Sequence, residues 1–179
     1  VGLSKAKGDY FVCVDSDDYL THDAVSKIKE ALSKIDKDRH IGIVGLKRHI
    51  DGSNIGTGMP VQVAETTLQD LYNLHHFRGD ALLVYNTKIA KKHLFPKIIG
   101  EKFIPEAYIY DQLDREGALL IMASAVYVCE YLDNGYSNNF NKTLHNNPKG
   151  FMLYNRQRIR LATTSIAKYK ACINYDIAS

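Results

Sequence analysis

The stretch Tyr-Phe-Val-Cys-Val-Asp-Ser-Asp-Asp at residues 10–18 decides the predicted fold. Its first five residues form a continuous apolar run that follows a Gly-Asp turn signal and ends at Asp15. Such a run is typical of a strand buried on both faces of a sheet. Three carboxylates then follow at the C-terminal end of the strand. Ligands bind at this end of the strands in open α/β sheets, so we expect the functional site there.

The three carboxylates are those of Asp15, Asp17 and Asp18. They repel one another unless a cation or hydrogen-bond donors lie among them. Hard oxygen ligands grouped in this way suit Mg²⁺ or Mn²⁺ held together with substrate phosphates. A polar turn that leads into a helix is the alternative, and the spacing alone does not decide between them. An EF-hand calcium loop is excluded, because Leu20 and Ser26 stand where that loop needs Gly and Glu.

The rest of the sequence predicts alternating strands and helices, which is typical of the α/β class. Further strands are expected at residues 40–50, 81–85 and 118–131, and helices at residues 24–35, 66–75, 87–93 and 105–116. We therefore expect a mostly parallel sheet flanked by helices in residues 1–146. In residues 147–179, apolar residues that recur every seven positions predict one long C-terminal helix.

Composition excludes several classes of protein. Hydrophobic residues make up 45% of the 179 residues and charged residues 24%, which excludes a disordered chain. The formal net charge of +3 is small and evenly spread, so nucleic acid is not expected as a partner. No apolar stretch reaches the ~18 residues of a membrane span. Cys13, Cys129 and Cys172 lack the spacing of metal ligands, which suits reduced thiols in a cytoplasmic protein.

Three stretches of the chain resemble glycosyltransferases of family 2. Residues 2–20 are similar to the middle of such an enzyme, where a small-residue stretch and an apolar strand precede Asp-Ser-Asp-Asp. Residues 100–106 resemble the segment that holds the family's acceptor-activating carboxylate, and residues 131–137 its later Tyr…Asp-Gly-x-Ser stretch. The resemblance implies an A-type glycosyltransferase fold. It also implies inverting transfer of a sugar from a nucleotide-diphospho-sugar to a hydroxyl acceptor.

The resemblance also implies roles for five residues. Asp17 is expected to bind the divalent cation, and Asp15 to lie nearer the ribose or to share the cation through water. Asp18 is expected to join Asp17 as a ligand of the cation or to assist Asp15, with a carboxylate that only faces solvent as the alternative. Glu106 is the expected general base, with Asp111 as the fallback. The alternative for Glu106 is an acidic residue that only stabilises the first turn of a helix.

Two nucleotide-binding stretches of the family, Pro-x-Tyr-Asn and Asp-Asp-Gly-Ser, do not occur in this sequence. We therefore expect a C-terminal fragment, inactive alone, that keeps the cation-binding and acceptor half of a truncated sheet. An exposed edge of that sheet is expected to pair with a second copy in a homodimer.

The family resemblance implies a bacterial enzyme of cell-surface polysaccharide or lipid-linked oligosaccharide synthesis, with a saccharide or lipid-linked acceptor. A cytoplasmic location follows, with peripheral contact at the inner face of the cytoplasmic membrane through the basic C-terminal helix. A solvated helix face is the alternative. His145, in an Asn-rich stretch, is a candidate to approach the diphosphate. The competing hypothesis for the whole chain is a non-catalytic α/β module that binds a cation or a partner.

Overall fold

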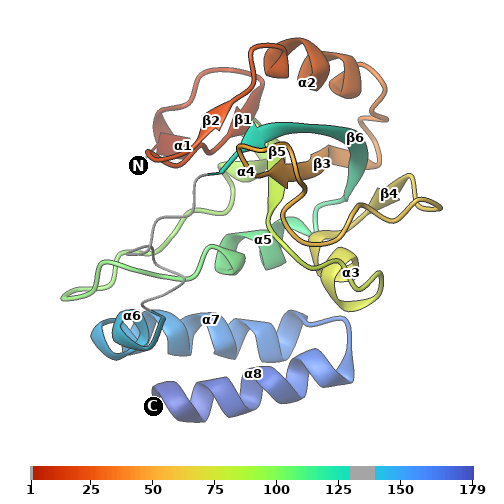
Figure 1. Cartoon of the computed structure of the whole chain (residues 1–179). Helices are drawn as coiled ribbons and strands as arrows, with labels where there is room; N and C mark the ends of the chain where they lie inside the picture. The colour runs from red at the N-terminus through yellow and green to blue at the C-terminus, as the bar shows by residue number, and fades with distance from the viewer. Residues whose placement is uncertain (1, 130–139) are drawn as a thin grey trace. The chain divides into compact units, whose positions relative to one another are not determined.

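The structure is a computed structural model that describes residues 2–129 and 140–179 (Figure 1). The chain divides into two compact units. The first, here called the sheet unit, comprises Val1–Lys92 and Glu116–Glu130. The second, here called the helical unit, comprises His93–Arg115 and Tyr131–Ser179. The functional division predicted from sequence, into residues 1–146 and 147–179, stays a prediction.

Five strands of the sheet unit form one sheet in the order β1-β5-β3-β6-β2, and a sixth, β4, pairs with β6 (Figure 1). In chain order the strands are β1 (Tyr10–Val12), β2 (Tyr19–Leu20), β3 (His40–Arg48), β4 (Glu65–Thr66), β5 (Ala81–Asn86) and β6 (Ala118–Val128). Helix α2 (Ala24–Leu32) packs its apolar stripe of Ala24, Ile28 and Ala31 into the core with strand residues such as Ile43. The predicted α/β class is confirmed.

The prediction of a mostly parallel sheet is wrong. In residues 2–129 and 140–179, only β3 and β6 run parallel, with Val44 opposite Ile121, and the other four pairings are antiparallel. An apolar run indicates a buried strand but not its direction, which depends on the connections between strands. Here β5 lies between β1 and β3 and runs against both of them.

Strand β1 is an edge strand, whereas its apolar sequence predicted burial on both faces. Its three residues are half-buried, and within the described ranges it pairs with β5 alone. A strand with one neighbour keeps one edge and part of each face accessible, which explains the difference.

Short helices connect the strands: α1 (Gly2–Lys5), α3 (Leu68–Asn73) and α4 (Thr87–Ala90). Helix α3 begins where the Thr67 side chain accepts a hydrogen bond from the Asp70 N–H at 3.1 Å. Helix α4 begins where the Asn86 side chain accepts from the Lys88 and Ile89 N–H groups. Both ends follow the usual preference for a short polar side chain at the N-cap.

The helical unit contains α5 (Ala107–Leu113), α6 (Phe140–Asn146), α7 (Pro148–Leu161) and α8 (Ser165–Ala178). The single long C-terminal helix predicted from sequence is wrong, since α7 and α8 are separate. Ala162 is extended, and the Thr164 hydroxyl accepts a hydrogen bond from the Ala167 N–H at 3.2 Å, which starts a new helix. No helix in the described part of the chain is long and apolar enough to cross a membrane.

Candidate functional site

The acidic turn, defined here as residues 15–18, lies between β1 and β2. The Asp18 N–H donates to the Asp15 carbonyl at 3.2 Å, which closes the turn. Strand β2 then pairs with the C-terminal end of β6, where Tyr19 lies opposite Val128. The same end of β6 pairs with the C-terminal end of β3, where Arg48 lies opposite Val128. The acidic turn is therefore tied to the end of the parallel pair, as expected for a ligand site in an α/β sheet.

Strand β6 contacts the acidic turn directly. The Asp15 N–H donates to the Tyr127 hydroxyl oxygen at 3.0 Å, and the Cys129 thiol donates to Asp18 Oδ2 at 3.4 Å. The Lys47 ammonium lies 4.1 Å from the centre of the Tyr127 ring. Burial raises the pKa of Tyr127, and burial raises the pKa of Cys129 to about 12. Both groups therefore keep their protons at neutral pH and remain donors.

The exposure of the three aspartates fits a cation that is shared with a substrate. Asp15 and Asp17 are exposed, whereas Asp18 is partly buried. Mg²⁺ usually binds through one or two carboxylates and completes its shell with water and substrate phosphates. Among residues 2–129 and 140–179, no group of three or more His, Cys, Asp or Glu side chains could hold a metal ion alone. Two exposed carboxylates match the shared kind of site.

The two predicted acceptor-side carboxylates belong to the helical unit, and their surroundings differ. Glu106 precedes the first residue of α5, is exposed, and accepts a hydrogen bond from the Tyr110 hydroxyl at 3.2 Å. Asp111, within α5, is only 2% exposed. Its Oδ1 lies 3.7 Å from Arg158 Nη1, and its Oδ2 has no hydrogen-bond partner in the part of the chain that the structure describes. Burial raises the pKa of Asp111 to about 6, Arg158 lowers it, and Asp114 raises it.

Helix α7 holds α5 and the segment before it. The Gln157 amide donates to the Tyr108 carbonyl at 2.7 Å, beside the Asp111–Arg158 pair. At the other end of α7, Glu101 accepts the N–H groups of Lys149 and Gly150 at 2.9 and 2.7 Å. A carboxylate at the N-terminus of a 14-residue helix is stabilised by the helix dipole.

The start of α7 is also reinforced from Asn147. Its side-chain oxygen accepts the N–H groups of Lys102 and Phe103 at 2.9 and 3.0 Å. A Cβ at Gly150 would lie 2.3 Å from the Phe103 carbonyl oxygen, so only glycine allows this close approach. The segment that leads to Glu106 is therefore fixed by backbone hydrogen bonds.

The structure thus describes the predicted site residues in two sets, one in each unit. Asp15, Asp17 and Asp18 share the acidic turn, and Glu106 and Asp111 share α5 with the residue before it. The stretch at residues 131–137 that resembled the family lies outside the described residues. His145 is exposed in α6 and not in a loop, because the Asn-rich stretch forms a helix.

Sequence reasoning missed Tyr127 and Cys129, which contact the acidic turn from more than 100 positions further along the chain. Their spacing of two residues at the end of an apolar strand was the only local signal, since alternate strand residues share a face.

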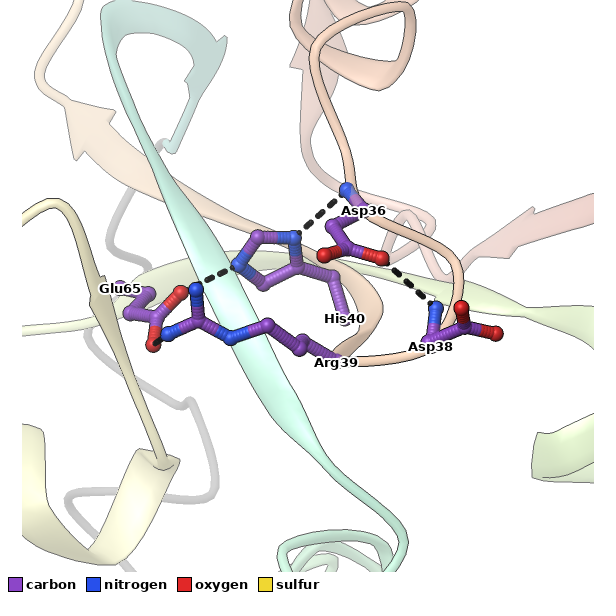
Figure 2. Close-up of polar contacts among 5 residues, drawn as sticks. All are labelled: Asp36, Asp38, Arg39, His40 and Glu65. Atoms are coloured by element: carbon purple, nitrogen blue, oxygen red, sulfur yellow. Dashed lines mark hydrogen bonds and ion pairs between the residues drawn. The ribbon is translucent and has the colours of Figure 1, made fainter.

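A second polar cluster lies at the opposite end of β3 (Figure 2). His40 Nδ1 accepts the Asp36 N–H at 2.9 Å, so Nε2 carries the proton that is shared with Glu65 at 2.7 Å. Arg39 also pairs with Glu65, and the Asp38 N–H donates to Asp36 at 2.9 Å. His40 is only 8% exposed. Its ring nitrogens are both engaged, so this cluster fastens β4 to the start of β3.

Comparisons with known proteins agree with this architecture. The model of the family described as glycosyl transferase family 2 matches residues 1–97, more than half of the 179-residue chain. The chain is 29% identical over 119 residues to glycosyltransferase GlyG of Streptococcus pneumoniae serotype 4, covering 62% of this chain and 40% of that protein.

Two solved structures of S. aureus TarS, residues 1–349, resemble the chain. One has a TM-score of 0.56 and 15% identity, and covers 98% of this chain and 48% of its own. The other, in complex with UDP-GlcNAc, has a TM-score of 0.61 and 16% identity. The match covers 98% of this chain and 50% of the TarS chain. The chain spans about half the length of these structures. The likeness confirms the predicted A-type glycosyltransferase fold, and the family match shows that the chain belongs to glycosyltransferase family 2.

Proposed function

We propose that the whole protein is an inverting glycosyltransferase that moves a sugar from a nucleotide-diphospho-sugar to a hydroxyl group of a saccharide or lipid-linked acceptor. Family membership supports glycosyl transfer. The UDP-GlcNAc complex of the S. aureus relative supports a nucleotide sugar as the class of donor, and UDP-GlcNAc is the first donor to test. The observation that carries the proposal is the pair of exposed carboxylates on the acidic turn, tied to the end of the sheet.

In this proposal Asp17 would hold Mg²⁺ or Mn²⁺, with Asp15 sharing the cation through water or contacting the ribose. When bound, the cation supplies Lewis acidity that neutralises the charge developing on the diphosphate leaving group. Exposed carboxylates meet this need because they reach a substrate without rearrangement of the core.

Glu106 is the proposed general base. Its carboxylate is exposed, and the Tyr110 hydroxyl orients it at the start of α5. It removes the proton of the acceptor hydroxyl as that oxygen attacks the sugar carbon. A single displacement assisted by one base inverts the configuration at that carbon. Asp111 has a pKa better suited to a base at neutral pH, but its carboxylate is buried and faces Arg158, away from solvent. We therefore assign Asp111 a structural role.

The same proposal places the enzyme in cell-surface polysaccharide or lipid-linked oligosaccharide synthesis, at the inner face of the cytoplasmic membrane. The exposed basic residues of α7 and α8, such as Arg156, Arg160 and Lys168, support peripheral contact with anionic lipid. Arg158 does not contribute, because it pairs with Asp111. Sedimentation with vesicles that contain anionic lipid tests the contact, and equal binding to neutral vesicles would contradict it. The accessible edge of β1 supports the proposed homodimer, and light scattering of the purified protein tests it.

The decisive experiment compares two Asp→Asn variants of the whole protein. With Mn²⁺ and a set of nucleotide sugars that begins with UDP-GlcNAc, the wild type releases nucleoside diphosphate and transfers sugar. D17N lowers the rate by about 100-fold or more, because it removes the charged ligand of the cation. D38N, at an exposed aspartate in the turn before β3, leaves the rate unchanged. A D17N rate equal to that of the wild type would contradict the proposal. Cation binding without any sugar transfer would favour the non-catalytic module instead.

We also propose that residues 1–179 alone bind UDP-GlcNAc weakly. The sequence contains neither the Pro-x-Tyr-Asn nor the Asp-Asp-Gly-Ser stretch that the family resemblance requires for the nucleotide. Calorimetric titration of the 179-residue chain checks this, and micromolar affinity would contradict it.

A further inference from the structure

The three aspartates of the acidic turn are not equivalent. Asp15 and Asp17 are exposed, whereas Asp18 is partly buried and its carboxylate faces β6. A carboxylate that leaves water needs hydrogen-bond donors, and a carboxylate that binds a shared cation needs access to solvent. The two environments therefore separate an inner aspartate from two outer ones.

The side chains of Tyr127, in β6, and of Cys129, just after it, contact the acidic turn. Cys129 donates its thiol hydrogen to Asp18 Oδ2 at 3.4 Å. The Tyr127 hydroxyl accepts the Asp15 N–H at 3.0 Å. Tyr127 is 1% exposed and Cys129 is 6% exposed, so both side chains lie in the core.

A lysine side chain also lies close to Tyr127 and Cys129. Lys47, on the neighbouring strand β3, places its ammonium 4.1 Å from the centre of the Tyr127 ring, and its charge also acts on Cys129. The acidic turn thus rests on two neutral side chains of the core, and the Lys47 ammonium lies over the ring of one of them.

We propose that Tyr127 and Cys129 are positioning residues that hold the acidic turn, Tyr127 at the Asp15 N–H and Cys129 at the Asp18 carboxylate, so that Asp15 and Asp17 face the cation and the diphosphate. Asp18 is then an anchor and not a cation ligand. This inference rests on the proposed function, because it takes the acidic turn as the cation site. It goes beyond that function by dividing the three aspartates and by assigning a role to two residues of the core.

Removal of the Tyr127 hydroxyl tests the anchor. Mn²⁺ binding to the whole protein is measured from the electron paramagnetic resonance of free Mn²⁺, with UDP as the diphosphate probe. Y127F and D18N each weaken Mn²⁺ binding by about tenfold, the usual loss when a group that orients a metal ligand is removed. D17N abolishes it. The matched control is Y72F, which removes the Tyr72 hydroxyl from the Gly79 carbonyl, at 2.8 Å, elsewhere in the sheet unit. It leaves the affinity unchanged.

A second measurement reports the anchor without any metal. The Asp15 N–H donates a hydrogen bond to the Tyr127 hydroxyl oxygen, so its amide hydrogen exchange is faster in Y127F than in the wild type. In D17N the exchange of this N–H stays as slow as in the wild type. Cys129 gives an independent pair of variants if Y127F does not fold. C129A weakens Mn²⁺ binding, whereas C129S, which keeps a donor, retains it.

The outcomes separate the two proposals. If D17N binds Mn²⁺ as the wild type does, the proposed function fails at this site. If D17N abolishes binding while Y127F and C129A bind as tightly as the wild type, the anchor is overturned and the proposed function stands. Loss of binding in D18N as complete as in D17N, with Y127F and C129A unaffected, would make Asp18 a ligand.

Discussion

The acidic turn of the sheet unit and the start of α5 in the helical unit each combine exposed and less exposed carboxylates, but Asp18, partly buried, and Asp111, buried, are held differently. Asp18 accepts a hydrogen bond from the neutral Cys129 thiol, whereas Asp111 faces an arginine and leaves one oxygen without a hydrogen-bond partner among the described residues. The pKa of Asp111 is raised to about 6 by burial. Carboxylates of the same residue type thus lie in different surroundings in this chain, exposed, hydrogen-bonded to a neutral donor or buried against an arginine.

The two exposed carboxylates with proposed roles, Asp17 and Glu106, also differ in what holds them. Asp17 precedes the anchor by one residue on a turn, so its position depends on the contacts that Asp18 makes with β6. Glu106 precedes a helix that α7 holds through Arg158 and Gln157. We therefore expect the acidic turn to be sensitive to changes in β6, and Glu106 to be sensitive to changes in α7.

Removal of divalent cations has the largest expected effect. EDTA lowers sugar transfer by the whole protein by about 1,000-fold, because a cation supplies several kcal/mol of charge stabilisation at the leaving group. Release of nucleoside diphosphate measures the rate, and added Mn²⁺ restores it. If the dialysed enzyme transfers sugar at full rate in EDTA, the acidic turn does not act by binding a cation, and the proposed role of Asp17 is contradicted.

The substitution E106Q lowers kcat by about 100-fold and leaves KM for the donor nearly unchanged, because it removes the proton acceptor but no donor contact. Steady-state kinetics of the whole protein measure both constants. The matched control is E30Q, at an exposed residue of α2 whose carboxylate pairs with Lys34. An unchanged kcat in E106Q, with a large loss in D111N, would transfer the role of base to the buried aspartate.

Asp111 makes the free energy of unfolding depend on pH. Its folded-state pKa of about 6 lies above the ordinary aspartate value of 3.8, so the folded protein binds more protons than the unfolded chain between these values. The contribution of Asp111 to the free energy of unfolding is therefore greatest below about pH 4, falls as pH rises to about 6, and then levels off. The fall is on the order of 3 kcal/mol.

The variant D111N isolates this contribution. Urea unfolding between pH 4 and pH 7 shows the free energy of the wild type falling relative to that of D111N as pH rises. The control D176N, at an exposed aspartate of α8, follows the wild type. A constant difference between D111N and the wild type across this range would mean that the carboxylate is ionised throughout, as an exposed one is.

The smallest expected effect concerns the hydroxyl that orients Glu106. Y110F removes one hydrogen bond to an exposed carboxylate, worth about 0.5–1 kcal/mol, so kcat falls by about two- to fivefold. Y169F, at an exposed tyrosine of α8, leaves kcat unchanged. A loss as large as that of E106Q would show that Tyr110 itself takes part in proton transfer.

Local patterns in the sequence were enough to predict much of the fold and the acidic turn. The apolar stripe of residues 24–35 predicted the helix observed as α2. The apolar run before Asp15 predicted the strand observed as β1, which the carboxylates follow. Strand direction could not be predicted, because β5 pairs with β1 and β3 through contacts distant in sequence. The break between α7 and α8 was missed, because the seven-residue repeat of apolar residues outweighed the cap at Thr164.

The functional division within each set of carboxylates could not be predicted either. Nothing near Asp18 shows that Tyr127 and Cys129 lie beneath it, and nothing near Asp111 shows that Arg158 faces it. Burial and partners depend on tertiary contacts, whereas the residue types and their spacing are visible in the sequence. The residue types and their spacing therefore predict candidate site residues, and the structure shows which of them are exposed and which are buried.

The most direct measurement is the anomalous diffraction of crystals of the whole protein soaked with Mn²⁺ and UDP-GlcNAc. The account predicts a manganese peak bound by the Asp17 carboxylate and the diphosphate, with Asp18 turned toward Tyr127 and Cys129. A manganese peak elsewhere, or none near Asp17 while UDP-GlcNAc is bound, would contradict it.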